Sequence, residues 1–480
     1  MMNLTVEEIM KACGGRLTNH ETGAARDSSV FLKVLVSSVS TDSRSPAPGC
    51  LFVPIAGPRF DGHDYIAQMA AEGAVCALTE KEPDWAGTPS NFPLIRVDST
   101  RRALLDIAAY YRSLFNVKVV AVTGSVGKTT TKDMVAHVLS QRYKTKKTEG
   151  NLNNDIGMPL SIFQLEAQDE VLVLEMGMNH FGEIRALSLV AKPDAALITN
   201  IGDAHIEFLG SREGILKAKL EITEGLDGGL LIVNGDDPLL FSIHEEKINP
   251  KIYFCMTERD GEKIETDIYA TGVEPHGLNG TRCVFHINGN AREVTVPLPG
   301  PFMVMNALMA AAAGDYLGMS PEEIVRGIET FLPVSANRME IVAANGMTVI
   351  NDTYNASPTS MRAGIDVLTA GGETENGRKV CVFGDMLELG EHAEKLHREL
   401  GAYAATRRVD CLIAVGELGK FIYEGYIAAK GKAEALRFDD KAGFTEKWRE
   451  ILQPGDTVLI KASRGMAFEE IVNEITFEKR

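Results

Sequence analysis

The chain has 480 residues, of which 45% are hydrophobic and 24% charged, and its formal net charge is −17. A length beyond what one hydrophobic core supports predicts several domains. The negative charge argues against nucleic acid or an anionic membrane as the main partner. Seven scattered cysteines without a Cys-x-x-Cys pair are typical of reduced thiols, and the N-terminus lacks a basic-then-apolar leader. We therefore expect a cytoplasmic, monomeric protein with no nucleic-acid partner and no stable membrane insertion.

Three stretches of the chain show different patterns. Residues 1–100 mix short apolar runs with glycine and proline, which predicts a small α/β domain. Residues 101–332 open with a helix-like segment and then alternate apolar strands with helices, with a Thr/Val/Gly-rich antiparallel appendage expected at about 250–300. Residues 333–480 repeat the alternation. Continuous apolar strands separated by helices predict parallel sheets covered on both faces. The strands expected in these two stretches are Val171–Glu175, Ala195–Asn200, Leu230–Val233, Met347–Asn351, Val380–Phe383, Cys411–Val415 and Thr457–Ile460.

A phosphate-binding loop is the most informative motif. A β-branched run ends at Gly124, glycine recurs at Gly127, and Lys128 and Thr129 open a helix-like segment. Backbone N–H groups and the helix N-terminus can hold phosphates, the lysine can reach the outer phosphates, and the threonine can bind Mg²⁺. Val122 stands where longer loops of this type have glycine. The residues expected at the phosphates are Gly124, Ser125, Val126, Gly127, Lys128, Thr129 and Thr130.

Polar residues follow several of the predicted strands, where ligands gather in parallel sheets. Glu175 ends an apolar strand, and a buried carboxylate there suits Mg²⁺ bound to ATP; the alternative is a helix cap or an exposed strand end. His205 also follows a strand, although a lone histidine is more often structural. Lysines such as Lys219 are usually solvated. The residues alone therefore do not decide whether His205 and Lys219 are functional or structural.

The remaining polar segments allow two interpretations each. Three asparagines within Gly150–Pro159 suit either a ligand or a turn, and Asp352-Thr353-Tyr354-Asn355 suits either a nucleotide's ribose and base or a polar loop. Arg338 and the segment Lys461–Gly465 offer positive groups for a carboxylate or phosphate. A basic cluster near Lys144 is either a solvated face or a phosphate-gathering patch.

Taken in order, these motifs resemble the Mur ligases, ATP-dependent amide-forming enzymes of peptidoglycan precursor synthesis. The resemblance spans the whole chain. It implies three α/β domains, with a UDP-sugar-binding domain at 1–100, a central P-loop parallel-sheet ATP-binding domain at 101–332 and a C-terminal Rossmann-like ligase domain at 333–480. The segments that carry it are Thr41–Arg44, Leu51–Val53, Gly57–His63, Thr123–Thr129, Asn151–Gly157, Glu175–His180, Asp352–Ala356, Gly384–Gly390 and Lys461–Arg464. The last three are similar to the family branch that adds D-alanyl-D-alanine, and the Asp-Asn-Pro-Arg signature of the diaminopimelate- or lysine-adding branch is absent.

The resemblance also implies chemistry: ATP-dependent joining of D-alanyl-D-alanine to UDP-N-acetylmuramoyl-tripeptide through an acyl phosphate, with two Mg²⁺ ions. The implied catalytic residues are Lys128, Glu175, His205 and Lys219. Thr129 and Glu175 would hold one Mg²⁺ and His205 would help hold the second, while Lys219 matches a lysine that is carbamylated in several relatives and bridges to metal. Further nucleotide contacts are implied for Asn306, Arg338, Asp352 and Tyr354. Substrate contacts are implied for Ser43, Arg44, Phe60, His63, Asn153, Asn154, Asn355, Ser463 and Arg464.

The chain departs from the family pattern in a few places. Phe302-Met303 stands where relatives commonly carry His-Asn, so that only Asn306 of that group is kept. Ala462 stands where relatives usually have glycine, and Asn337 stands where they have glycine or histidine. We therefore expect the nucleotide contacts near residue 302 to be rearranged or lost. Alternative functions are a folylpolyglutamate synthase-like ligase, a nucleotide-binding protein that has lost ligation, or an unrelated P-loop kinase or motor.

Overall fold

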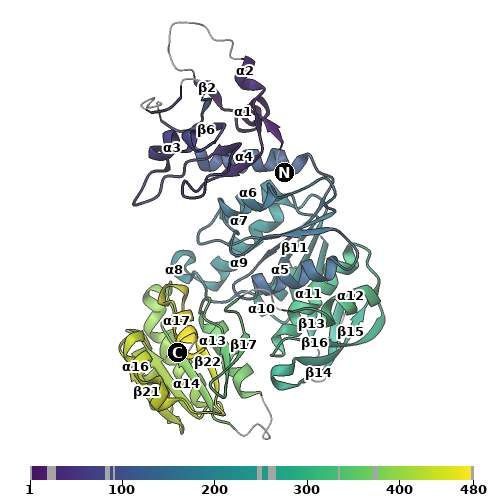
Figure 1. The fold of residues 1–480 in the computed structure, drawn as a ribbon. Coiled ribbons are helices and arrows are strands. Elements are labelled where there is room, and N and C mark those ends of the chain that lie inside the picture. Colours follow the sequence, from purple (N-terminus) through teal and green to yellow (C-terminus); the bar gives the residue numbers. More distant parts are fainter. Residues whose placement is uncertain are drawn as a thin grey trace.

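The computed structural model describes residues 3–18, 29–81, 87–89, 92–245, 251–257, 266, 268–332, 336–370 and 377–476. Three α/β lobes follow one another along the molecule, with the first at the top of Figure 1, the second in the centre and the third at the lower left. Each lobe is built on its own main β-sheet. The predicted fold class of three α/β domains is confirmed, while the boundaries near residues 100 and 333 stay a prediction.

The first lobe is a five-stranded sheet in the order β2-β7-β6-β5-β4, parallel except for the β2–β7 pair, with a separate β1–β3 ribbon. The α/β pattern expected for this stretch is found. Its elements are β1 (Leu4–Thr5), α1 (Val6–Cys13), β2 (Arg16–Thr18), α2 (Ser29–Leu32), β3 (Leu35–Val36), β4 (Ser38–Ser40), β5 (Cys50–Phe52), α3 (Ile66–Ala71), β6 (Cys76–Thr79) and β7 (Leu94–Arg96).

The middle lobe holds a nine-stranded sheet in the order β16-β15-β14-β13-β12-β11-β8-β10-β9. Its elements are α4 (Thr100–Ser113), β8 (Lys118–Thr123), α5 (Lys128–Leu139), β9 (Thr145–Lys147), α6 (Gly157–Ile162), β10 (Val171–Glu175), α7 (Glu183–Ala191), β11 (Ala195–Ile198), α8 (Ile206–Leu209), α9 (Arg212–Leu220), β12 (Leu230–Asn234), α10 (Pro238–Ser242), β13 (Lys251–Thr257), β14 (Ile268–Pro275), β15 (Thr281–Ile287), β16 (Asn290–Val296), α11 (Phe302–Tyr316) and α12 (Pro321–Glu329).

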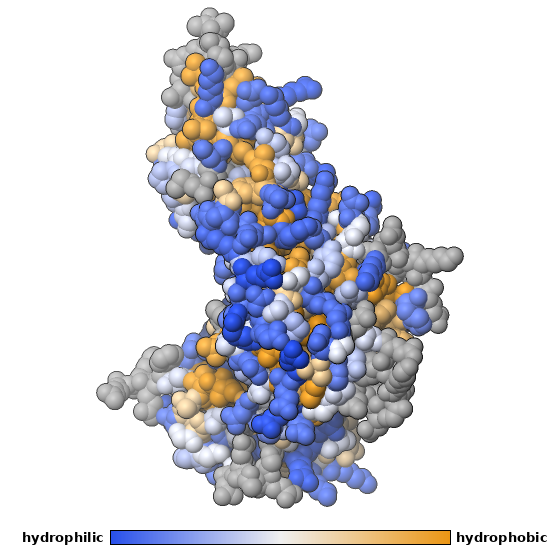
Figure 2. Space-filling model, turned by 90° about the vertical axis from the view of Figure 1, so that its right-hand side faces the viewer, coloured by the Kyte–Doolittle hydropathy of each residue, from blue (hydrophilic) through white to orange (hydrophobic). Residues whose placement is uncertain are grey.

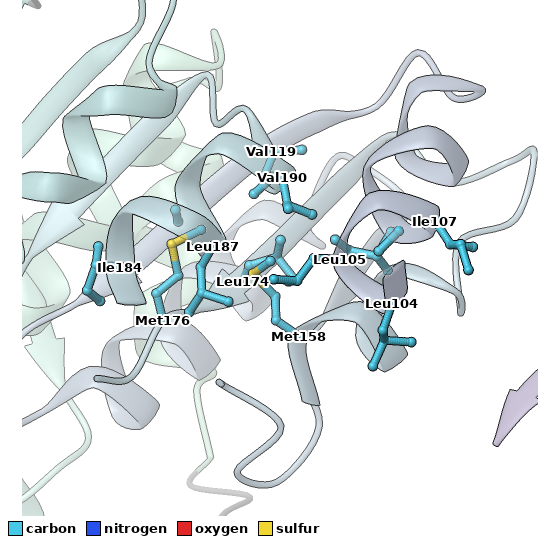
Figure 3. Packing of buried hydrophobic residues seen from close by; sticks show 14 of the residues in the cluster. Leu104, Leu105, Ile107, Val119, Met158, Leu174, Met176, Ile184, Leu187 and Val190 are labelled. Atoms are coloured by element: carbon cyan, nitrogen blue, oxygen red, sulfur yellow. The ribbon is translucent and has the colours of Figure 1, made fainter. Parts of the chain in front are cut away.

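Alternate residues of the strands point to opposite faces of this sheet, and helices cover both faces, so both are buried. Val119 and Ala121 of β8 belong to the core under α4, α6 and α7, and Figure 3 shows side chains of these three helices meeting those of β8 and β10. Val120 and Val122 belong to the opposite core, under α5, α11 and α12. The helix α4 also packs on α1, so it joins the first lobe to the second.

The stretch 250–300 differs in part from the predicted antiparallel appendage. β13 and β14 pair in parallel and continue the central sheet beyond β12, and only β14, β15 and β16 form antiparallel pairs. The physical reason is that β13 covers the edge of β12, which would otherwise leave its backbone groups unpaired. Cys255, Ile268 and Ala270 then pack in the core under α11.

The third lobe is a six-stranded sheet in the order β17-β18-β22-β19-β20-β21, parallel except for the β17–β18 hairpin. All four predicted strands of this lobe are present. Its elements are β17 (Glu340–Ala344), β18 (Met347–Asn351), α13 (Pro358–Thr369), β19 (Lys379–Phe383), the 3-10 turn η5 (Gly390–His392), α14 (Ala393–Ala405), β20 (Cys411–Val415), α15 (Gly419–Ala428), β21 (Glu434–Phe438), α16 (Lys441–Ile451), β22 (Thr457–Lys461) and α17 (Glu469–Thr476).

Figure 2 shows hydrophilic residues over most of one face, with hydrophobic residues in smaller groups between them. Within the described residues, no helix combines the length and the apolar character that crossing a membrane requires.

Candidate active site

A cavity of about 570 Å³ lies between the middle and third lobes. The middle lobe contributes its phosphate loop and the ends of β10 and β11, and the third lobe contributes the ends of β18 and β22. Most residues predicted for the site line this one cavity, although they come from distant parts of the sequence. They are Ser125, Val126, Gly127, Lys128, Thr129, Thr130, Asn153, Asn154, Glu175, His205, Asn306, Arg338, Asp352, Tyr354, Asn355, Ser463 and Arg464.

The phosphate loop is shaped by two glycines and by the neighbouring strand β11. Gly124 and Gly127 have φ angles of 149° and 83°, which favour glycine. Thr199, directly after β11, donates from Oγ1 to Val126 O at 2.6 Å, and Asn200 accepts from Val126 N–H at 2.9 Å. These bonds fix the loop immediately before α5 begins at Lys128, so that the helix N-terminus faces the cavity.

Lys128 is partly buried and lies against its own loop. Its ammonium donates to Gly124 O at 2.9 Å, which folds the side chain over its own loop. Burial lowers the pKa of Lys128, while the charge of Glu175 acts in the opposite direction. A cation held in this way can neutralise phosphate oxygens in a place shielded from water.

Glu175 meets the requirement for a metal-binding carboxylate. The residue is 2% exposed, and its Oε1 accepts from Asn153 Nδ2 at 2.8 Å. Its Oε2 is buried without a hydrogen-bond partner in the described part of the chain. A buried carboxylate oxygen with no partner is costly, and a cation there would satisfy it. Thr129 lines the same cavity, so Glu175 and Thr129 fit a Mg²⁺ ion that shares its remaining ligands with phosphate and water.

His205 and Lys219 both lie close enough to Lys128 for its charge to act on them. Burial and then the charges of Lys128 and Lys219 lower the pKa of His205 from its usual 6.5 to about 4, so the imidazole is neutral at physiological pH. Lys219 is 2% exposed, and burial followed by the charge of Lys128 lowers its pKa far below the ordinary value. The neutral imidazole has a free electron pair, which suits a metal ligand, and the lowered pKa of Lys219 favours the neutral, nucleophilic form of its amine. Lys219 itself does not line the cavity.

No group of three or more His, Cys, Asp or Glu side chains in the residues that the structure describes could hold a metal ion by itself. Mg²⁺ bound to a nucleotide usually takes few protein ligands, and phosphates and water complete its shell. The donor set of Thr129, Glu175 and His205 fits that arrangement.

The third lobe closes the cavity with cations and one aromatic ring. The guanidinium of Arg338 lies 3.7 Å from the Tyr354 ring centroid, and that of Arg464 lies 5.6 Å from it. Lys461 donates to Asp352 Oδ2 at 2.6 Å and to Asn355 O at 2.7 Å. The ion pair fixes the loop after β18, so that the tyrosine ring has a defined place in the cavity wall.

The two residues that depart from the family pattern, Phe302 and Met303, lie in the wall of the same cavity. Met303 Sδ accepts a weak hydrogen bond from Asn306 Nδ2 at 3.4 Å. The amide of Asn306 lies beside Gly127, where an added Cβ would come within 3.4 Å of its oxygen. Asn306 thus reaches the phosphate loop without the usual polar neighbours.

The predicted substrate residues of the first lobe do not line this cavity. Arg44 reaches into solvent and pairs with Asp42, and Phe60 is 62% exposed. His63 is bonded on both ring nitrogens, to Asp61 at Nδ1 and to the N–H of Glu80 at Nε2, so it holds the loop in place. The substrate contacts of Ser43, Arg44, Phe60 and His63 stay predictions, and they would belong to a binding site on the first lobe.

Two contributors to the site were not predicted from the sequence. Thr199 supports the phosphate loop, and the signal for it was its position directly after β11. Glu388 lies beside His205, with 2.9 Å between Oε2 and Nδ1. No sequence signal links residues so far apart. The basic cluster near Lys144 is largely paired, since Lys147 contacts Asp133 at 2.6 Å, which favours the interpretation as a structural face.

A strand, a glycine loop and a helix that open together into a cavity shared with a second α/β domain define a multidomain nucleotide-binding protein of the P-loop type. Comparison with known proteins narrows this class. Models described as the Mur ligase family catalytic domain, the Mur ligase middle domain and the Mur ligase glutamate ligase domain match residues 35–112, 122–314 and 337–464. The chain belongs to the Mur ligase family.

Similar proteins match over the full length. The UDP-N-acetylmuramoyl-tripeptide–D-alanyl-D-alanine ligase of Bacillus subtilis is 40% identical over 481 residues, which cover 99% of each chain. A crystal structure of MurF from Acinetobacter baumannii superimposes with a TM-score of 0.87 at 32% identity, covering 99% of each chain. MurF ligase from Thermotoga maritima, solved in complex with ADP, gives a TM-score of 0.78 at 28% identity, covering 91% of this chain and 96% of that one.

Proposed function

We propose that the protein is an ATP-dependent, ADP-forming ligase that joins D-alanyl-D-alanine to UDP-N-acetylmuramoyl-tripeptide. The full-length similarity to the Bacillus subtilis enzyme of that name supports the substrates. The observation that carries the chemistry is the shared cavity, where Lys128 and Glu175 of one lobe face Arg338 and Tyr354 of another. ATP is the nucleotide, because the Thermotoga maritima relative was solved with ADP and the loop that would hold its phosphates is present here.

The reaction has two steps. A carboxylate oxygen of the tripeptide attacks the γ-phosphorus of ATP, the bond to the β–γ bridging oxygen breaks, and ADP and an acyl phosphate form. The amine of D-alanyl-D-alanine then attacks the acyl carbon, inorganic phosphate leaves with the bonding electron pair, and the amine gives up a proton. Lys128 and the N-terminus of α5 neutralise the transferring phosphoryl group, which is the main demand of such a step.

Thr129, Glu175 and His205 would hold the Mg²⁺ ions, and Mg²⁺ bound there would supply further charge neutralisation. Asn153 orients the carboxylate of Glu175 for this role. Arg338, Tyr354 and Asp352 would position the base and ribose, since a guanidinium stacked on an aromatic ring presents a flat face to a nucleobase.

Lys219 is proposed to carry a carbamate. Burial lowers the pKa of Lys219 and so favours its neutral amine, whose nitrogen can attack carbon dioxide, forming an N–C bond and releasing one proton. The product is an anion that can reach a metal. Carbon-13 NMR of protein equilibrated with ¹³C-bicarbonate tests this: a carbamate resonance in the wild type that Lys219→Ala removes and Lys217→Ala keeps supports the modification. A resonance that survives Lys219→Ala contradicts it.

The first lobe is proposed to hold the uridine diphosphate of the substrate through Ser43, Arg44 and Phe60. Arg44 and Phe60 are exposed and so are open to a ligand, while His63 acts by fixing their loop region. Arg44→Ala is expected to raise the KM for the UDP-tripeptide and leave the KM for ATP unchanged. We also propose that the protein is monomeric and cytoplasmic.

Phosphate release by the purified protein tests the function. Turnover is expected only when ATP, the UDP-tripeptide and D-alanyl-D-alanine are all present, with a lysine or a diaminopimelate tripeptide tested separately. Turnover with a folate and glutamate would show the folylpolyglutamate synthase-like alternative. ATP binding without turnover on any substrate would show a binding protein that has lost ligation.

A further inference from the structure

The loop Gly384–Gly390, between β19 and α14, is held rigidly by the third lobe. The carboxylate of Asp385 accepts the N–H groups of Leu418 and Gly419 at 3.0 and 2.8 Å. His397, fully buried, accepts the N–H of Met386 on Nε2 at 2.9 Å. Asp385 is therefore fixed to the start of α15 and Met386 to α14, while Gly384 donates its N–H to Lys461 O of β22 at 3.0 Å, and together these bonds set the direction of the residues that follow.

The same anchoring continues toward the cavity. The N–H of Leu387 donates to Ser463 Oγ at 2.9 Å, and Glu388 follows with a φ of 61°, a conformation that residues other than glycine rarely adopt. Strain of this kind persists only where the surrounding structure imposes it, and it often marks a functional position. The loop is thus shaped to present Glu388 in one direction.

That direction is the middle lobe. Glu388 Oε2 lies 2.9 Å from His205 Nδ1, and Gly390 packs on the side chain of Glu207 in α8, where an added Cβ would come within 3.1 Å of Cγ. His205 also has a left-handed backbone, with a φ of 64°. The ring nitrogen and the carboxylate oxygen are within hydrogen-bond distance but not aligned, since Nδ1 makes no hydrogen bond of good geometry with any residue that the structure describes. Glu388 is half exposed, so its side chain can rotate to complete the bond.

We propose that Glu388 is a positioning residue, which orients the imidazole of His205 from the third lobe so that Nε2 presents its electron pair to a metal ion. This rests on the proposed function and deepens it. Histidines that ligate a metal usually donate their other N–H to a carboxylate or carbonyl, which fixes the tautomer and the ring orientation. Here the carboxylate comes from a different domain than the histidine, so docking of the third lobe would complete the metal site.

The test uses Mn²⁺, which prefers the same oxygen-rich ligands as Mg²⁺. Binding of Mn²⁺ to the full-length protein, with a non-hydrolysable imido analogue of ATP, is followed by electron paramagnetic resonance. Glu388→Ala is expected to weaken one Mn²⁺ site by about 10-fold or more. Glu388→Gln keeps an acceptor oxygen and restores most of the affinity. Glu391→Ala, three residues further on and 90% exposed, is the matched control and leaves binding unchanged.

A double variant separates positioning from a direct role. His205→Ala is expected to lose the same Mn²⁺ site, and Glu388→Ala added to it has no further effect. Wild-type affinity in Glu388→Ala, additive losses in the double variant, or Mn²⁺ binding that His205→Ala leaves intact would each overturn the proposal. A kinetic effect confined to the KM for the dipeptide would also overturn it, and would assign Glu388 to the incoming amine. The titration needs no ligase turnover, whereas failure of the proposed function shows in the wild type.

Discussion

Gly124→Ala tests how the phosphate loop is built. The φ of 149° at this position disfavours any side chain, and a methyl carbon would lie well inside 3.0 Å of Thr199 Oγ1. Thr199 therefore has to move away from the methyl group. This movement breaks the hydrogen bond that its hydroxyl donates to Val126 O at 2.6 Å across the loop. We therefore expect the variant to distort the loop rather than the core beneath it.

The cost has two parts. Backbone strain at such a φ is about 1–3 kcal/mol. The lost hydrogen bond of Thr199 adds about 0.5–1.5 kcal/mol. If the loop escapes this cost by leaving its nucleotide-binding shape, ADP affinity falls by about 30-fold or more, since about 1.4 kcal/mol is a factor of ten.

Isothermal titration of ADP with Mg²⁺ measures this loss, and circular dichroism checks the fold. Thr199→Ala alone removes only the hydrogen bond and should weaken binding by about 5-fold. In the double variant the hydroxyl is gone and the methyl group has more room, so the combined loss is smaller than the sum of the two. Affinity of Gly124→Ala within about 3-fold of the wild type, or full additivity, would refute the reasoning.

Three further predictions concern single residues of the cavity. Glu175→Gln keeps the hydrogen bond from Asn153 but removes a buried charge. The free energy of unfolding of the nucleotide-free protein should therefore rise by about 1–3 kcal/mol and its thermal midpoint with it, while Mg²⁺-dependent ATP binding weakens. A lower midpoint with unchanged Mg²⁺ dependence would contradict this. Tyr354→Phe should bind ADP like the wild type, whereas Tyr354→Ala should lose about 1–3 kcal/mol of binding; equal affinities would exclude stacking. His205 has a pKa of about 4 when folded and about 6.5 when unfolded, so the unfolded chain binds more protons between these values and stability rises with pH from about 4 to 6.5. Thermal midpoints of the nucleotide-free protein should show this rise, and His205→Gln should reduce it, with burial of His137 and His397 contributing the remainder; an equal slope in both would exclude His205.

Local patterns predicted the parts of the fold that local physics decides. Val171–Glu175 is a continuous apolar run and is found as β10 with the same ends, because a strand buried on both faces leaves its mark in the sequence. β21, with the sequence Glu-Ala-Leu-Arg-Phe, escaped notice because it is an edge strand that is partly exposed. The helix α15 contains two glycines and carries apolar residues around its circumference, so it lacks a clear period.

Local motifs likewise predict some residues of the candidate site, whereas others depend on the folded chain. The phosphate loop follows from its glycines and lysine, and Glu175 follows from its place at a strand end. The importance of Lys219 came only from the resemblance, since burial and a lowered pKa are properties of the folded chain. The approach of Glu388 to His205 depends on how two lobes dock, and this information is absent from any local pattern.

The central claim is that one cavity couples ATP cleavage to formation of an amide bond. Incubation of the purified protein with ATP, Mg²⁺, UDP-N-acetylmuramoyl-tripeptide and D-alanyl-D-alanine, with mass spectrometry of the products, tests it most directly. The account predicts one UDP-muramoyl-pentapeptide for each ADP formed, and neither product with Lys128→Ala. ADP without pentapeptide, or pentapeptide from Lys128→Ala, would contradict it.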